Sequence, residues 1–279
     1  MAWKIPVGDV IEATIDFLAD NFSFATKAFT RVVETGLDVL VGGMGLLPPW
    51  LFIILAAALA WWLSKRRGIG LFTVLGLGLV WNMGLWDPTL STIALVLVAT
   101  AIAVMIGVPL GIFAALNQTF FRVVTPILDF MQTMPAFVYL IPAIPFFGLG
   151  KVAAIFSTVI FAMPPSIRLT SLGIRQVPGE LVEAADAFGS TKSQKLFKLQ
   201  LPLATPTILA GVNQTIMLAL SMVVIAAMIG AKGLGGEVWK AIQRLEPGRG
   251  FEAGIGIVIV AIILDRIMQQ VGGGNKRRE

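Results

Sequence analysis

The sequence predicts an all-α protein, a polytopic bundle of about seven transmembrane helices. Of its 279 residues, 57% are hydrophobic and 13% are charged, against a charged fraction of about 25% in soluble domains. Apolar runs of about 20 residues, the length that crosses a bilayer, recur along the chain. Lys and Arg gather in short clusters at the ends of these runs. This pattern is typical of membrane topology and not of a nucleic-acid-binding surface.

Residues 1–48 are predicted to form an amphipathic segment and not a span. Charged side chains alternate there with an apolar stripe whose members recur at steps of four and three: Ile11, Ile15, Leu18, Phe22, Ala25, Phe29 and Val32. We therefore expect one or two amphipathic helices that lie in the membrane interface or pack on the flank of the bundle. A coiled coil is the alternative, but the pattern lasts only about three heptads and contains Gly36.

The membrane-spanning part divides into two regions. Residues 49–86 are predicted to hold two accessory helices, over 49–63 and 69–85, and the first is extended back over 44–48 to reach spanning length. Residues 87–270 are predicted to hold five more, over 90–116, 123–149, 152–172, 204–229 and 253–268. Four prolines, at 126, 135, 142 and 145, predict that the element over 123–149 is broken or kinked. Residues 271–279 form a basic tail, expected in the cytoplasm.

One long polar interruption lies between the spans 152–172 and 204–229. Apolar residues at three- and four-residue intervals predict two short helices there, joined by a turn over 189–191, with the second stopped before Pro202. Acidic side chains belong to the first helix and basic side chains to the second. Each sign therefore lies where the helix dipoles favour it.

Seven residues in this interruption stand at the spacing of the Glu-Ala-Ala loop of type I ABC import permeases, which the segment 175–202 resembles. They are Glu183, Ala184, Ala185, Gly189, Leu199, Leu201 and Pro202. The one departure is Leu199, where that family usually has isoleucine, and leucine keeps the apolar contact. The resemblance implies a cytoplasmic loop that couples the permease to a separate ATPase. Residues 131–143, 161–178 and 213–235 resemble permeases that import glycine betaine, proline betaine and related quaternary ammonium osmoprotectants.

The resemblance implies a set of partners in a bacterial cell membrane. These are a second permease copy in a homodimer, two cytoplasmic ATPase subunits that hold ATP and Mg²⁺, and an extracytoplasmic substrate-binding protein. The chain has no phosphate-binding motif, so we expect no cofactor and no enzymatic activity in it. With the loop inside, the N-terminus lies outside and the C-terminus in the cytoplasm. There are two alternatives. One is a permease for another small solute, such as an amino acid, methionine, choline or carnitine, and the other is a secondary carrier. The ATP dependence of uptake and the choice of substrate would separate them.

Several residues are candidates for roles inside the membrane. Asp129 and Arg168 stand at matching depths and are expected to pair, because an unpaired charge there is costly; snorkelling of both is the alternative. Candidates for lining the pathway are Tyr139, Gln214, Ser221 and Met222. For the polar residues of 213–221, hydrogen bonding between helices is the alternative to lining the pathway. Aromatic candidates for contacting a quaternary ammonium group are Phe137, Phe146, Phe147 and again Tyr139.

Two further expectations concern metals and the outer loop. The chain has no His and no Cys, so no metal site is expected. Residues 232–250 are rich in glycine and are predicted to contain a short helix over 237–245. This loop is either a flexible connector or a lid at the mouth of the pathway.

Overall fold

The computed structural model describes residues 6–273, and every regular element in this range is helical. In chain order the elements are α1 (Val7–Asn21), α2 (Ser23–Gly45), α3 (Pro49–Ser64), α4 (Arg67–Asn82), α5 (Trp86–Leu116), α6 (Gln118–Thr133), the 3₁₀ turn η1 (Ala136–Tyr139), α7 (Leu140–Phe147), α8 (Lys151–Arg175), α9 (Gly179–Ala187), α10 (Lys192–Lys195), the π-helical turn η2 (Leu196–Gln200), α11 (Leu201–Ala227), α12 (Leu234–Arg244) and α13 (Pro247–Gly273). The predicted all-α class is confirmed. Of the predicted basic tail, residues 274–279 lie outside the described range.

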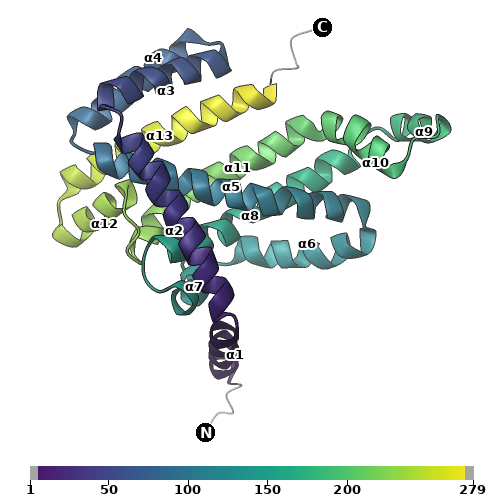
Figure 1. The fold of residues 1–279 in the computed structure, drawn as a ribbon, viewed down its shortest axis with the longest axis horizontal. Coiled ribbons are helices and arrows are strands. Elements are labelled where there is room, and N and C mark those ends of the chain that lie inside the picture. Colours follow the sequence, from purple (N-terminus) through teal and green to yellow (C-terminus); the bar gives the residue numbers. More distant parts are fainter. Residues whose placement is uncertain (1–5, 274–279) are drawn as a thin grey trace.

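The helices α5, α8 and α11 form the centre of the bundle (Figure 1). Small residues let them approach closely. A Cβ atom added at Gly111 of α5 would lie 2.6 Å from the Cβ of Thr170 on α8, and one at Gly211 of α11 would lie 3.0 Å from the Cβ of Leu169. Since lipid is as apolar as leucine, such close backbone packing is a main source of helix association in membranes.

Three continuous helical segments are long and apolar enough to cross a membrane: α5, α8 and the segment Lys192–Ala227. Two sharply bent pairs, α2 with α3 and α6 with η1 and α7, raise the number to as many as five among the described residues. The apolar helix α4 has 16 residues and is shorter. A polytopic helical bundle is therefore confirmed, and the count of seven spans stays a prediction.

The two bends lie at prolines. The predicted break within 123–149 is confirmed, because α6 ends at Thr133 and the chain turns by 110° around Pro135. The backward extension of the first span over 44–48 is wrong, because α2 ends at Gly45 and the chain bends by 103° before α3 begins at Pro49. Pro48 and Pro49 lack N–H groups and disfavour helical conformation in the preceding residue, so the helix cannot continue through them.

The N-terminal segment forms two helices, and α2 packs on α5 and α7. Its buried face consists of Val33 and Leu37, with the partly buried Phe29 and Leu40 beside them. Of the predicted stripe, Phe29 lies on this packed face, but Val32 is 72% exposed and the neighbouring Val33 is buried in its place. Many apolar residues around α2 allow more than one face to pack, and contact with the bundle selects one of them.

The glycine-rich segment before α12 is packed inside the bundle. Leu234 is fully buried, and its N–H donates to Thr92 Oγ1 on α5 at 2.8 Å. A Cβ atom at Gly235 would lie 2.3 Å from the carbonyl oxygen of Val223. The helix α12 therefore begins at Leu234, three residues before the predicted start, and its first turn is anchored and not a flexible connector.

Candidate functional site

The first arm of the polar hairpin is α9, which ends in a left-handed glycine. Gly189 has φ 72°, and its N–H donates to the carbonyl of Asp186 at 2.9 Å. The N–H of Ser190 reaches back to the carbonyl of Ala185 at 3.0 Å. This pair of bonds ends a helix and needs a residue without a Cβ penalty at the turn. The predicted turn over 189–191 is confirmed.

The second arm begins with a capping box. The N–H of Gln194 donates to Thr191 Oγ1 at 3.3 Å, and the N–H of Thr191 donates to Gln194 Oε1 at 2.9 Å. This Thr-x-x-Gln pattern is a sequence signal for a helix start that was not among the predictions above.

The prediction that the second arm stops before Pro202 is wrong. The arm continues through the π-helical turn Leu196–Gln200 into α11, and the helical segment Lys192–Ala227 has 36 residues. Pro202, which has no N–H, comes directly after this turn, in which the N–H of Leu201 donates to the carbonyl of Leu196. One helix therefore joins the hairpin to the centre of the bundle.

Two contacts stiffen the hairpin. Lys195 Nζ lies 2.7 Å from both carboxylate oxygens of Asp186 and links the two arms. At the base, Leu196 is buried in a cluster with Ile174 of α8 and Ala204 of α11. The hairpin is thus tied across its arms and fixed to the bundle at its foot.

The tip of the hairpin packs on nothing in the described chain. No residue of α9 or α10 is buried, and the hairpin projects from the end of the bundle opposite α12 (Figure 1). Phe188 is 90% exposed and Phe197 is 63% exposed. Of the predicted coupling residues, the exposed ones are Glu183, Ala184, Gly189 and Pro202, and the half-buried ones are Ala185, Leu199 and Leu201. Phe188 therefore leaves an apolar surface at the tip of a polar projection that the described chain does not cover.

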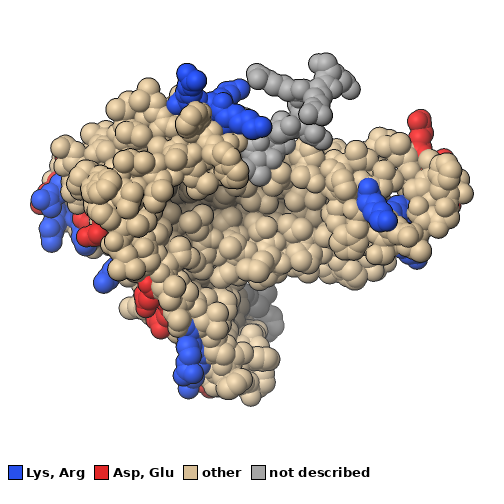
Figure 2. Space-filling view, turned by 45° about the horizontal axis from the view of Figure 1, so that its top comes forward, with Lys and Arg blue, Asp and Glu red and all other residues tan. Residues whose placement is uncertain are grey.

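Figure 2 shows charged side chains at the ends of this face of the molecule, with a broad uncharged surface between them. Arg168 Nη2 of α8 donates a hydrogen bond to Asp129 Oδ1 of α6, so the structure brings the predicted pair together. The Arg168 side chain is 34% exposed and the Asp129 side chain 59%. The pair lies on the surface of the single chain and is not buried within it. Its environment therefore depends on what covers α6 and α8.

The structure separates the four pathway candidates into two groups. Tyr139 is buried, its hydroxyl donates to the carbonyl of Met131, and Met222 is a fully buried core residue. Both side chains therefore serve packing within this chain. Gln214 and Ser221, by contrast, are exposed on one face of α11 and remain available to an adjoining surface.

Residues 107–272, more than half of the chain, match the family model described as binding-protein-dependent transport system inner membrane component. The chain belongs to this family. It is therefore a membrane permease component of a transport system, as the hairpin and the apolar helices predict.

Similar proteins cover nearly the whole permease. The glycine betaine transport system permease protein of Bacillus subtilis is 55% identical over 275 residues, which are 99% of this chain and 97% of that one. The glycine betaine/carnitine transport permease protein of Listeria monocytogenes is 53% identical, with 95% of each chain covered. The glycine betaine/proline betaine permease protein of Escherichia coli is 46% identical, with 98% of this chain and 77% of that one covered.

The fold also matches a solved transporter. A chain of the MetNI methionine ABC transporter in an inward-facing conformation superimposes with a TM-score of 0.62, over 67% of the permease and 94% of that chain. Sequence identity is 22%, so the match concerns the fold alone.

A polar link joins α11 and α13, and its acceptor, Asp265, was not among the predicted site residues. Asn213 Nδ2 donates to Asp265 Oδ1 at 2.9 Å, and Gln269 Nε2 donates to Asp265 Oδ2 at 2.7 Å. Asn213 thus takes the interhelical hydrogen-bonding role that was one of its two predicted roles. An aspartate within the apolar run 253–268 was the feature of the sequence that could have indicated this contact.

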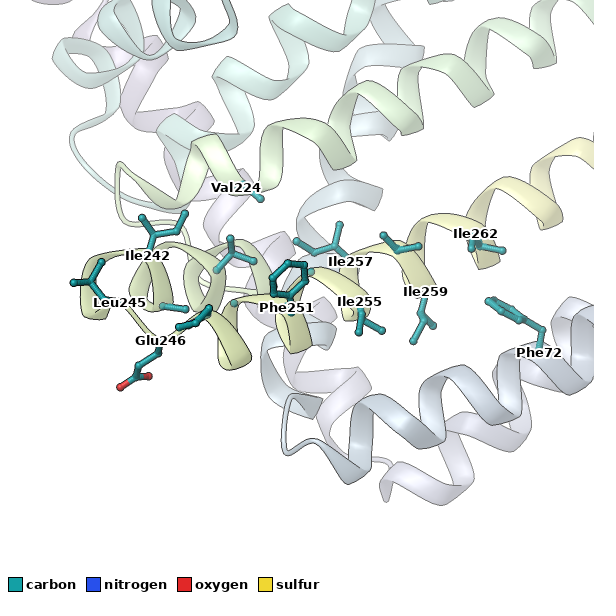
Figure 3. Close-up of a pocket in the computed structure, with 16 residues that line it drawn as sticks. Phe72, Val224, Ile242, Leu245, Glu246, Phe251, Ile255, Ile257, Ile259 and Ile262 are labelled. Carbon is teal, nitrogen blue, oxygen red and sulfur yellow. The ribbon is translucent and has the colours of Figure 1, made fainter.

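A wide apolar groove on the bundle is not suited to a polar solute. It has a volume of about 1130 Å³ and lies among α4, α11, α12 and α13 (Figure 3). Its lining is almost entirely apolar and includes Phe72, Phe251 and Ile255, while the Glu246 carboxylate points away from these side chains. A charged solute would lose its hydration there without compensating hydrogen bonds. This groove fits a hydrocarbon environment and not the substrate.

Proposed function

We propose that the permease is the membrane-spanning subunit of an ATP-driven importer for glycine betaine or closely related quaternary ammonium osmoprotectants. The observation that supports this substrate most directly is the likeness over 99% of the chain, at 55% identity, to a glycine betaine permease. Carnitine and proline betaine, which appear in the names of two other similar permeases, are the closely related substrates that we consider. A methionine substrate is not favoured, because the similarity to the MetNI methionine transporter, at 22% sequence identity, concerns the fold alone.

The hairpin supplies the proposed link to ATP hydrolysis. In this proposal α9 and the tip at Phe188 insert into a groove on a cytoplasmic ATPase, which carries ATP and Mg²⁺. The support is a hairpin with a salt bridge between its arms, an exposed Phe188 at its tip, and a second arm that continues into the bundle core. A movement of the ATPase would then be transmitted along 36 residues without an intervening loop.

The proposal also includes the assembly and its orientation. Two permease copies form the pathway, with two ATPases inside and a substrate-binding protein outside. The hairpin and the C-terminus lie in the cytoplasm, while the N-terminus and α12 lie outside. Gln214 and Ser221, on the exposed face of α11, are the residues that we expect near the passage between the copies.

Uptake by reconstituted vesicles tests the proposal. The permease is co-purified with its ATPase, reconstituted, and supplied with the binding protein outside and ATP inside. We expect ATP-dependent accumulation of radiolabelled glycine betaine that excess proline betaine suppresses and excess methionine does not. Suppression by methionine alone would contradict the substrate assignment. Uptake driven by an ion gradient without ATP would instead support a secondary carrier.

A further inference from the structure

An open cavity of about 560 Å³ lies between α2 and α7, away from the apolar groove. It is close to the start of α8, because Asp38 in its lining lies 2.5 Å from Lys151 Nζ. The hairpin follows the other end of α8, so the cavity and the hairpin lie on opposite sides of the bundle. In the proposed orientation the cavity opens toward the outside.

Charged residues line the α2 side of this cavity in a fixed order. Lys27, Arg31, Glu34 and Asp38 recur at steps of four, three and four, which places them on one face of the helix. The two cations come first along the helix and the two carboxylates follow. In the range 6–273, no ion pair within 4.0 Å involves Arg31 or Glu34. Both charges are therefore free to contact a ligand.

The spacing of these two charges suits a small zwitterion. Residues three positions apart on a helix have Cβ atoms about 5–6 Å apart. One compact molecule with a cationic and an anionic end can therefore contact Arg31 through its carboxylate and Glu34 through its cation. An ion of a single sign would leave one of the two side chains without a partner.

Aromatic rings line the opposite side. Phe146 and Phe147 of α7 have ring centroids 6.2 Å apart at an angle of 45°. The ring of Phe147 is held from behind by Phe156 of α8 at 4.7 Å and by Phe29 of α2 at 5.4 Å. A quaternary ammonium group cannot donate hydrogen bonds, and ring faces beside a carboxylate are the surroundings that recognise it.

We propose that this cavity binds a quaternary ammonium zwitterion and is a substrate site on the permease, distinct from the site on the binding protein. The trimethylammonium end lies against Phe146 and Phe147 near Glu34, and the carboxylate end faces Arg31. This inference rests on the proposed substrate class. The competing account is a charged helix face that contacts only water.

Ligand-observed NMR on the whole permease–ATPase complex in lipid nanodiscs, without the binding protein, tests the site. Glycine betaine is the probe, and glycine is the competitor that lacks the methyl groups. We expect saturable binding of glycine betaine that glycine does not displace. Phe146→Ala should weaken binding about threefold to tenfold. Glu34→Gln, at an exposed position that bears no packing, should do the same, while the matched control Glu12→Gln on α1 should bind like the wild type.

Absence of saturable binding to the wild type would overturn the inference, and so would equal binding by all three variants. If either result accompanied normal ATP-driven uptake of glycine betaine, the cavity assignment would fail while the proposed function stood. If the wild-type complex failed to take up glycine betaine at all, the proposed function itself would fail.

Discussion

Replacing Gly189 by valine should uncouple ATP hydrolysis from transport while the bundle remains folded. Gly189 has φ 72°, a conformation that costs a residue with a side chain about 1–2 kcal/mol and a β-branched residue more. Nothing lies within 4 Å of an added Cβ atom, so the cost is backbone strain and not a clash. Because 1.4 kcal/mol corresponds to a factor of about ten, the native turn should lose about tenfold or more in population relative to other turns. Since α9 has no buried residue, core packing is unchanged.

The assay compares uptake and ATP hydrolysis in the same vesicles. We expect the Gly189→Val complex to lose at least about four fifths of ATP-driven uptake, with a normal melting temperature of the permease. The matched control is Gly189→Asn, since asparagine tolerates the left-handed region and should retain most of the transport. Wild-type uptake by the valine variant would refute the reasoning. An equal loss in both variants would show that the backbone conformation is not what matters at this position.

Three other predictions concern the bundle and its orientation. In the Asp129–Arg168 pair, Arg168→Gln should lower the free energy of unfolding by about 1 kcal/mol or more, and the double variant Asp129→Asn/Arg168→Gln should lose less. Additive losses in thermal melts would show that the two residues are not coupled. Gly111→Val should destabilise the permease by about 1–3 kcal/mol, because its Cβ would lie 2.6 Å from the Cβ of Thr170. The control Gly254→Val, whose Cβ would have nothing within 4 Å, should have little effect on the melting temperature, and equal melting of the two variants would contradict the packing argument. The chain has no Cys, so a cysteine at Ser190 should react with an impermeant label only in opened cells and one at Glu246 in intact cells; the reverse pattern would invert the topology.

The sequence was most informative where a local rule determines the structure. Helical spacing with a glycine at the turn predicted the hairpin, because the left-handed ending of α9 depends on Gly189 alone. Prolines predicted the break in the element 123–149, because the missing N–H of Pro135 cannot be replaced within a helix. Neither conclusion needed information on distant parts of the chain.

Predictions that depended on distant contacts were less successful. The packed face of α2 passes through Val33 and not Val32, because the helix rotates to fit the bundle and its own pattern allows both. The helix through Pro202 continues because a π-helical turn precedes it, which no propensity indicates. The buried start of α12 depends on a hydrogen bond from Leu234 to Thr92, a residue 142 positions away. Such contacts become visible only when the helices are placed together.

The same distinction applies to the candidate site residues. Tyr139 and Met222 have the side chains expected of a passage, but both are packed inside the chain, since composition does not tell which face of a helix points inward. Asp129 and Arg168 were paired correctly from their depths alone. Their exposure could not be predicted, because it depends on how closely α6 approaches α8.

The most direct test of the coupling claim is a photo-crosslink from the tip of the hairpin. A benzophenone amino acid replaces Phe188, which is 90% exposed, and the complete transporter is irradiated in its native membrane. We predict one dominant product, identified by mass spectrometry as the permease joined to its ATPase subunit, and a change in its yield when ATP is added. A product joined to lipid alone, or to an extracytoplasmic protein, would contradict the account.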